Sequence, residues 1–193
     1  MLQIVLIRPG STDYDVQQRI QGSLDIPLND RGLAEVEQTA DRLRGRGIEA
    51  VYAPGSQPAM QTAEQIARSL GVKRKKIERL QNLHQGLWEG MLVEDVRHKQ
   101  PKVYRQWQEQ PENVCPPEGE MLSEADQRVR AALTKLLRRN KNGIIGIVLP
   151  EPLLSLARRL LTGGELGDLW KATNGHDRVE LIEVNVEELL PSP

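Results

Sequence analysis

Short apolar segments alternate with longer amphipathic segments along this chain. Leu2–Ile7, Ala50–Tyr52, Ile144–Leu149 and Val179–Val184 are largely apolar and have the length of a strand. Short apolar runs bounded by turn-forming or charged residues predict buried strands. The first run ends where Pro9 opens a stretch rich in turn residues. The pattern therefore predicts four strands separated by other elements.

The segments between these strands repeat their apolar residues every three or four positions, as one face of a helix does. Asn29 is a candidate N-cap, Gly71 a candidate helix end, and the polar stretch Val93–Pro117 predicts helical turns joined by loops. Longer helices are predicted over about 33–43, 60–70, 123–136 and 152–161. Strands alternating with helices predict an α/β fold: a three-layer sandwich with one mixed, mainly parallel sheet flanked by helices. Residues 1–193 are expected to form a single domain.

Composition and charge exclude some classes of function. With a formal net charge of −1, the chain lacks the positive electrostatic field that a general nucleic-acid binder needs. The basic run Lys73–Lys76 follows a predicted helix end and is interpreted as solvated. No apolar run approaches the length of a membrane span, and the opening residues lead straight into Arg8, so neither a membrane segment nor a signal peptide is expected. With Cys115 as its one cysteine, the chain has no internal disulfide, and the cytoplasm is the expected compartment.

Several short motifs occur in a fixed order. They are Arg8–Asp13, Arg19–Gly22, Ile26–Gly32, Gln61–Glu64, Gly86–Gly90 and Pro116–Glu120. In this order and at this spacing they resemble the phosphoglycerate mutase-like branch of the histidine phosphatase superfamily. The resemblance covers nearly the whole chain and implies the three-layer fold already predicted.

The resemblance also implies a mechanism. In that family a histidine closing the first strand attacks the phosphoryl group, arginines and a second histidine neutralise its oxygens, and a carboxylic acid protonates the leaving group. In this chain Pro9 stands at the nucleophile, Pro58 at the helix-borne arginine, Asn82 at the acid and Pro150 at the second histidine. Arg8 is the member of the central charged set that remains. No catalytic residue is therefore predicted.

The leading hypothesis is a catalytically inactive pseudo-phosphatase with a binding, scaffolding or regulatory role. Its expected partner is an unidentified protein or a small phosphorylated ligand, with no nucleic acid and no membrane. The Trp88 turn or the Tyr104–Trp107 segment is a candidate surface for a protein partner. No cofactor is expected, and no metal, since the histidines lack close pairs or cysteine partners.

Other interpretations stay open. Arg8, Arg19, Gln21 and Gly22 are candidate residues of a remnant phosphate pocket, which would suit a sensor of phosphorylated anions. The same two arginines could equally hold neighbouring carbonyls and carboxylates. An active phosphatase of the phosphoglycerate mutase family is a further alternative.

A different enzyme in the same cleft is also considered, with His84 or Glu89 recruited to the chemistry. His84, however, is interpreted as a solvated loop histidine, and His98 and His176 lie in polar surroundings. Cys115 has no neighbour in sequence that would lower the pKa of its thiol, so a plain thiol is expected.

Overall fold

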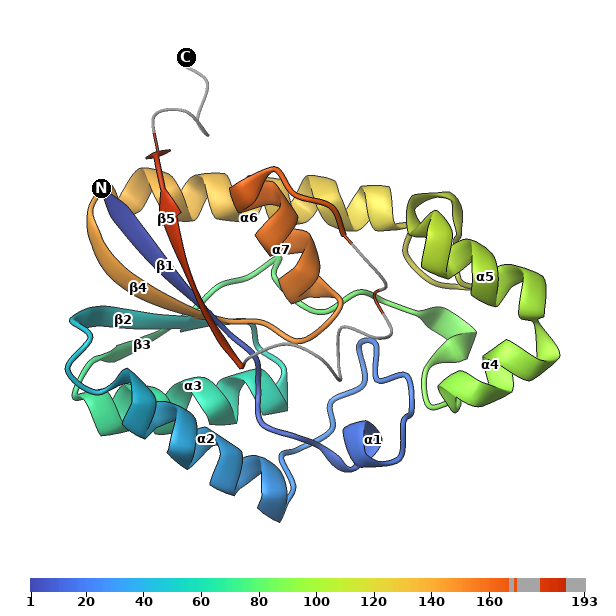
Figure 1. Cartoon of the computed structure of the whole chain (residues 1–193), viewed down its shortest axis with the longest axis horizontal. Helices are drawn as coiled ribbons and strands as arrows, with labels where there is room; N and C mark the ends of the chain where they lie inside the picture. Colours follow the sequence, from blue (N-terminus) through green and yellow to red (C-terminus); the bar gives the residue numbers. More distant parts are fainter. Residues whose placement is uncertain (167–168, 170–177, 187–193) are drawn as a thin grey trace.

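A five-stranded sheet forms the centre of the molecule (Figure 1). The structure is a computed structural model and describes residues 1–166, 169 and 178–186. The strand order is β3–β2–β4–β1–β5. Strands β1 (Leu2–Ile7), β2 (Ile48–Ala53), β3 (Lys73–Lys76) and β4 (Gly143–Val148) are parallel, and β5 (Val179–Val184) pairs antiparallel with β1. The predicted α/β fold with a mainly parallel sheet is confirmed.

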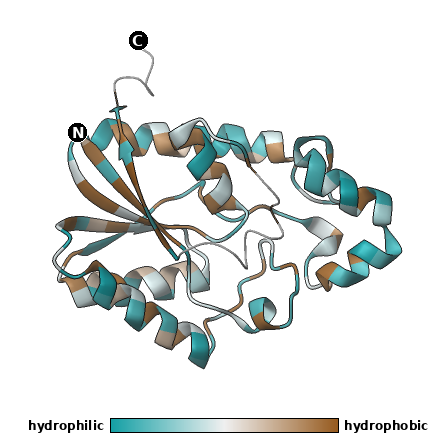
Figure 2. Cartoon of the chain, in the orientation of Figure 1, coloured by the Kyte–Doolittle hydropathy of each residue, from teal (hydrophilic) through white to brown (hydrophobic). Residues whose placement is uncertain are grey.

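Helices cover both faces of the sheet. Helices α2 (Asp30–Leu43) and α3 (Gln57–Leu70) lie on one face, and α6 (Leu122–Arg139) and α7 (Leu153–Thr162) lie on the other (Figure 1). Each side has its own cluster of buried apolar side chains. Figure 2 shows the inner strands β1 and β4 largely in hydrophobic colours and much of the outward helical surface in hydrophilic ones. Burial of both sheet faces is what makes these inner strands almost continuously apolar.

Shorter elements complete the described chain. They are α1 (Asp13–Val16), α4 (Val93–Lys99), α5 (Pro101–Glu109) and two 3₁₀ turns, η1 (Gly86–Trp88) and η2 (Pro111–Asn113). The prediction of helical turns between residues 93 and 117 is confirmed by α4, α5 and η2. Among the residues described, no helix is long and apolar enough to cross a membrane.

Local sequence signals set the helix ends as predicted. The Oδ1 atom of Asn29 accepts a hydrogen bond from the Gly32 N–H at 2.9 Å, which caps α2. Gly71 and Gly163 close α3 and α7 with φ angles of 69° and 73°. A residue without Cβ adopts this left-handed geometry without strain.

The prediction that the segment Lys73–Lys76 is solvated is confirmed, because it is exposed along its whole length. What the sequence did not predict is that it forms an edge strand, paired in parallel with Ala50–Ala53. All four of its residues are exposed, so its side chains carry no apolar alternation from which a strand could be predicted. Cationic residues on an edge also hinder pairing with another sheet.

Two tryptophan side chains are buried in the core. Trp88 is 1% exposed and Trp107 is 0% exposed. Their rings meet edge to face, with centroids 5.7 Å apart and planes at 86°. The two indole rings therefore do not face a partner, because both are buried against each other in the core. That the Trp88 turn or the Tyr104–Trp107 segment forms a surface for a partner stays a prediction.

Candidate functional site

A cavity of about 290 Å³ lies where β1 and β4 end. These strands are parallel neighbours, and Ile7 pairs with Val148. The residues that follow each strand therefore meet at one edge of the sheet, the usual place for a ligand in an open α/β sheet. Pro9 and Gly10 line the cavity from the β1 side, and Pro150 lines it from the β4 side.

The four residues that the family resemblance placed at catalytic positions all border this cavity. Pro9 follows β1, Pro58 is in the first turn of α3, Asn82 lies in the loop after β3, and Pro150 follows β4. Pro9 and Pro58 are buried, and Asn82 is 5% exposed. The tertiary structure thus brings together positions that are far apart in the sequence.

Asn82 connects three segments at the cavity. Its Nδ2 atom donates to the carbonyl of Gly22 at 2.9 Å and to the carbonyl of Glu151 at 3.1 Å. An ionised carboxylate has no donor and cannot make these two hydrogen bonds. Asn82 therefore holds the Gly22 loop against the loop that follows β4.

The predicted ligand set, Arg8, Arg19, Gln21 and Gly22, also lines the cavity. Arg19 donates from Nη1 to the Gly90 carbonyl at 2.6 Å and from Nε to Oε1 of a neighbouring glutamine at 2.7 Å. Oε1 of Gln21 accepts from the Thr12 hydroxyl at 3.2 Å. Their role in binding a ligand stays a prediction, and their contacts within the protein are those of residues that shape the loops.

Arg8 forms an ion pair inside the cavity wall. Its Nη2 atom lies 3.0 Å from Oε1 of Glu151, and the two side chains are 13% and 3% exposed. The second oxygen of Glu151 accepts from the Ser155 N–H at 3.2 Å and from the Ser155 hydroxyl at 2.8 Å. Ser155 is in the first turn of α7, where a negative charge is stabilised by the helix dipole.

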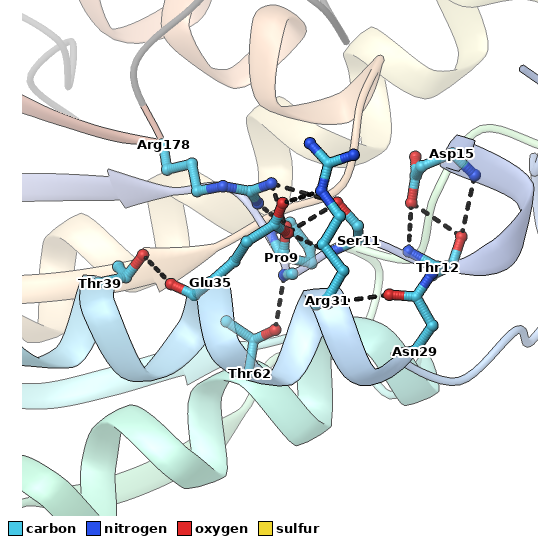
Figure 3. Close-up of polar contacts among 12 residues, drawn as sticks. Pro9, Ser11, Thr12, Asp15, Asn29, Arg31, Glu35, Thr39, Thr62 and Arg178 are labelled. Atoms are coloured by element: carbon cyan, nitrogen blue, oxygen red, sulfur yellow. Dashed lines mark hydrogen bonds and ion pairs between the residues drawn. The ribbon is translucent and has the colours of Figure 1, made fainter.

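A second ion pair holds the loop after β1 (Figure 3). Arg178 lies 2.5 Å from Glu35 and donates to the Pro9 carbonyl at 2.8 Å. The Glu35 carboxylate also accepts from the Ser11 N–H at 2.9 Å and the Ser11 hydroxyl at 2.7 Å. Gly10 allows this close packing, because a Cβ there would lie 2.4 Å from the Gly32 carbonyl oxygen.

This cluster changes the acidity of both partners. Burial alone raises the pKa of the Glu35 carboxyl, but hydrogen bonds from Ser11 and the charge of Arg178 outweigh it, so the pKa lies below its usual value. Burial lowers the pKa of Arg178, while the opposite charge of Glu35 partly restores it. Arg178 nonetheless keeps its proton at any physiological pH. The pair is therefore charged on both sides.

The sequence as a whole identifies the family. A model of the histidine phosphatase superfamily (branch 1) matches residues 4–189. The chain belongs to this superfamily. The predicted resemblance is thus confirmed at the level of the superfamily.

Named relatives within the superfamily are phosphatases and mutases. Phosphoserine phosphatase 1 of Hydrogenobacter thermophilus is 28% identical over 188 residues, 97% of this chain and 88% of that protein. A probable phosphoglycerate mutase of Yersinia pestis is 31% identical over 137 residues, 71% of this chain and 64% of the relative. The solved structure of YhfR from Bacillus stearothermophilus superimposes with a TM-score of 0.83 at 26% identity, covering 96% of this chain and 92% of that one.

The residues considered for a substitute activity do not line the cavity. His84 is exposed, and the described residues that line the cavity include neither His84 nor Glu89. The Glu89 carboxylate instead accepts from the Ser23 N–H at 2.8 Å and the Gln85 N–H at 2.9 Å. This geometry gives the hypothesis of a recruited His84 or Glu89 no support.

The remaining candidates are on the surface or outside the described residues. His98 is exposed and pairs with Glu94 at 2.9 Å, and Cys115 is an exposed free thiol. His176 lies outside the described residues. Within the described part, no group of three or more His, Cys, Asp or Glu side chains could hold a metal ion.

Three residues at this site were missed from the sequence: Glu35, Glu151 and Arg178. Glu151 had a signal, since it directly follows Pro150 at a position implied by the family. Glu35 lies on the polar side of a helix and Arg178 just before a strand, and nothing local distinguishes either from a surface charge. Both contact Ser11, from which Arg178 is 167 residues away and Glu35 is 24 residues away in the sequence.

Proposed function

We propose that this chain is a non-catalytic member of the histidine phosphatase superfamily that uses the fold for binding, scaffolding or regulation. The observation that supports it is the convergence of Pro9, Pro58, Asn82 and Pro150 on one cavity. A proline side chain is neither a nucleophile nor a base and carries no charge, and an amide does not donate a proton as a carboxylic acid does. The cavity therefore lacks the groups that the superfamily reaction needs.

The rate acceleration that phosphate-ester hydrolysis needs is far larger than a site without its catalytic groups can provide. Hydrolysis of phosphate monoesters can require acceleration by up to about 10²¹. A hydrolase stripped of its catalytic groups retains roughly 10³–10⁴ over water. Each lost hydrogen bond to a charged group also removes about 1.5–3 kcal/mol from phosphate binding. A cavity that keeps Arg8 but has Pro58 and Pro150 where the family pattern has an arginine and the second histidine is accordingly expected to be a poor phosphatase.

The replacements are compatible with the fold. Pro58 is in the first turn of α3, where a backbone N–H has no partner within the helix. Pro9 and Pro150 follow strands, and the Pro150 carbonyl still accepts from the Leu154 N–H at 3.0 Å. The scaffold can therefore persist for binding after the chemistry has gone. Such a role suits an unidentified protein partner or small ligand in the cytoplasm.

Phosphate release from several monoesters tests this proposal. Phosphoserine and 3-phosphoglycerate are the first substrates to try, because relatives are named phosphoserine phosphatase and phosphoglycerate mutase. We expect wild-type protein to release no more phosphate than a heat-inactivated sample. Turnover above that control, abolished by Arg8→Ala, would show an active phosphatase instead.

A second candidate function is a sensor of phosphorylated anions that binds without turnover. It is favoured by the presence of Arg8, Arg19, Gln21 and Gly22 in the cavity wall. Calorimetric titration with phosphorylated sugars and glycerates distinguishes it. Heat of binding at millimolar ligand supports the sensor, and its absence leaves a protein partner as the object of the search.

A further inference from the structure

Donors of the kind that bind anions lie in the cavity wall and directly behind it. Arg8 lines the cavity and contributes a guanidinium, whereas Ser155 is buried behind Glu151 and contributes a hydroxyl and a backbone N–H in the first turn of α7. Arginine, hydroxyl groups and the N-termini of helices are the usual partners of phosphate and carboxylate groups. These donors point to one place, and an anion occupies it: the carboxylate of Glu151.

Glu151 is a tightly held occupant. One of its oxygens faces Arg8 at 3.0 Å, and the other accepts both hydrogen bonds from Ser155. Its side chain is 3% exposed, so water competes little for it. Its own backbone carbonyl is bound by Asn82, which anchors the residue at the cavity. Both oxygens of the carboxylate and the backbone of the residue are therefore held by protein partners.

We infer that Glu151 is a resident anion that keeps phosphoryl groups out of this cavity. A phosphoryl group approaching Arg8 meets a carboxylate within a few ångströms, and like charges at such a separation repel strongly outside bulk water. Glu151 is thus a residue that determines ligand specificity, and it makes phosphorylated molecules poor ligands of the wild-type protein. The inference rests on the proposed non-catalytic function, and it states that the cavity excludes phosphorylated ligands.

Titration with inorganic phosphate at constant ionic strength tests this role. The variants are Glu151→Gln, which removes the charge and keeps the size, and Glu151→Ala, which removes both. We expect each to bind phosphate about ten- to a hundredfold more tightly than wild type, the range for one charged hydrogen bond made available. Asp126→Asn is the matched control, because Asp126 likewise forms a partly buried pair with an arginine, Arg159 of α7, but does not line the cavity.

The double variant Arg8→Gln/Glu151→Gln locates the site. The gain in phosphate affinity seen with Glu151→Gln must disappear in the double variant if Arg8 binds the phosphate. Far-ultraviolet circular dichroism and thermal unfolding check that each variant is folded. If Glu151→Ala does not fold, the size-conserving variant Glu151→Gln still provides the test.

Three outcomes overturn the inference: wild type binding phosphate as tightly as the Glu151 variants, no binding by folded Glu151→Gln, or a gain that persists without Arg8. Each of these leaves the non-catalytic proposal untouched, because that proposal fails on turnover of phosphomonoesters by wild-type protein. The two failures are therefore distinguished by the type of assay.

Discussion

The pairs Glu35–Arg178 and Glu151–Arg8 each place an arginine in the cavity wall, but they have different roles. Glu35 and Arg178 grip the backbone after β1, through Ser11 and through the Pro9 carbonyl. Glu151 instead holds the Arg8 side chain and the start of α7. The first pair therefore stabilises a loop, and the second governs which charges the cavity can accept.

The comparison shows that the effect of removing the carboxylate of an ion pair depends on what else its hydrogen-bond donors can bind. Without Glu35, the Ser11 N–H and a half-buried Arg178 lose partners that water replaces poorly. Without Glu151, Arg8 still lines an open cavity that water or a dissolved anion can enter. The same chemical pair thus has different consequences in the two places.

The largest expected effect comes from Glu35→Ala. This change removes hydrogen bonds to Ser11 and leaves Arg178 without its carboxylate, so the free energy of unfolding should fall by about 2–4 kcal/mol. Urea denaturation measures it. Millimolar phosphate should restore little of the loss. A change below that of Glu151→Ala would contradict the structural role given to this pair.

Glu151→Ala should lower the free energy of unfolding by less, about 1–2 kcal/mol. The change removes a contact to the first turn of α7, while the Arg8 guanidinium can then face the cavity. Phosphate should then raise the thermal midpoint of this variant, because a ligand that binds the folded state stabilises it. Differential scanning fluorimetry with and without phosphate measures both effects. A thermal midpoint that phosphate leaves unchanged would remove the distinction between the two pairs.

A weaker effect is expected from pH. The pKa of Glu35 is lower in the folded state than its ordinary value of 4.5, so its stabilisation is fully present above that value and is lost as pH falls through the folded-state pKa. In urea titrations carried into this acid range, wild type should lose stability more steeply than Glu35→Gln. Parallel acid slopes for the two proteins would show that Glu35 is not the group responsible.

The smallest effect is expected from Arg31→Ala. Arg31 pairs with Glu35 at 2.9 Å, but its side chain is 71% exposed. Exposed pairs of this kind contribute about 0–1 kcal/mol to stability. Chemical denaturation should therefore show a change far below that of Glu35→Ala. A loss of similar size would mean that Arg31, and not Arg178 with Ser11, is the main partner of Glu35.

Most of the fold could be predicted from the sequence because it depends on burial. β1, β2, β4 and β5 follow from apolar segments, and the main helices follow from apolar faces bounded by residues such as Asn29 and Gly71. The edge strand β3 could not be predicted in this way. Lys73–Lys76 bury nothing, and their strand geometry depends on backbone pairing with β2.

Some features of the candidate site could likewise be predicted from the sequence, and others depended on the tertiary structure. The identity of the residues at 9, 58, 82 and 150 is a matter of sequence, and it predicts the missing chemical groups. That these positions border one cavity follows from neighbouring parallel strands ending at one edge. The burial of Trp88 against Trp107 is likewise a result of packing that local pattern did not indicate.

The sequence by itself determined the family and the order of most strands and helices along the chain, and it predicted that prolines stand where the family pattern implies histidines. The tertiary structure alone decided which charges meet. Arg8 and Glu151 are 143 residues apart, and their pairing depends on β1 and β4 lying side by side. Electrostatic interaction depends on distance and burial in space, and neither is written in the local pattern of a chain.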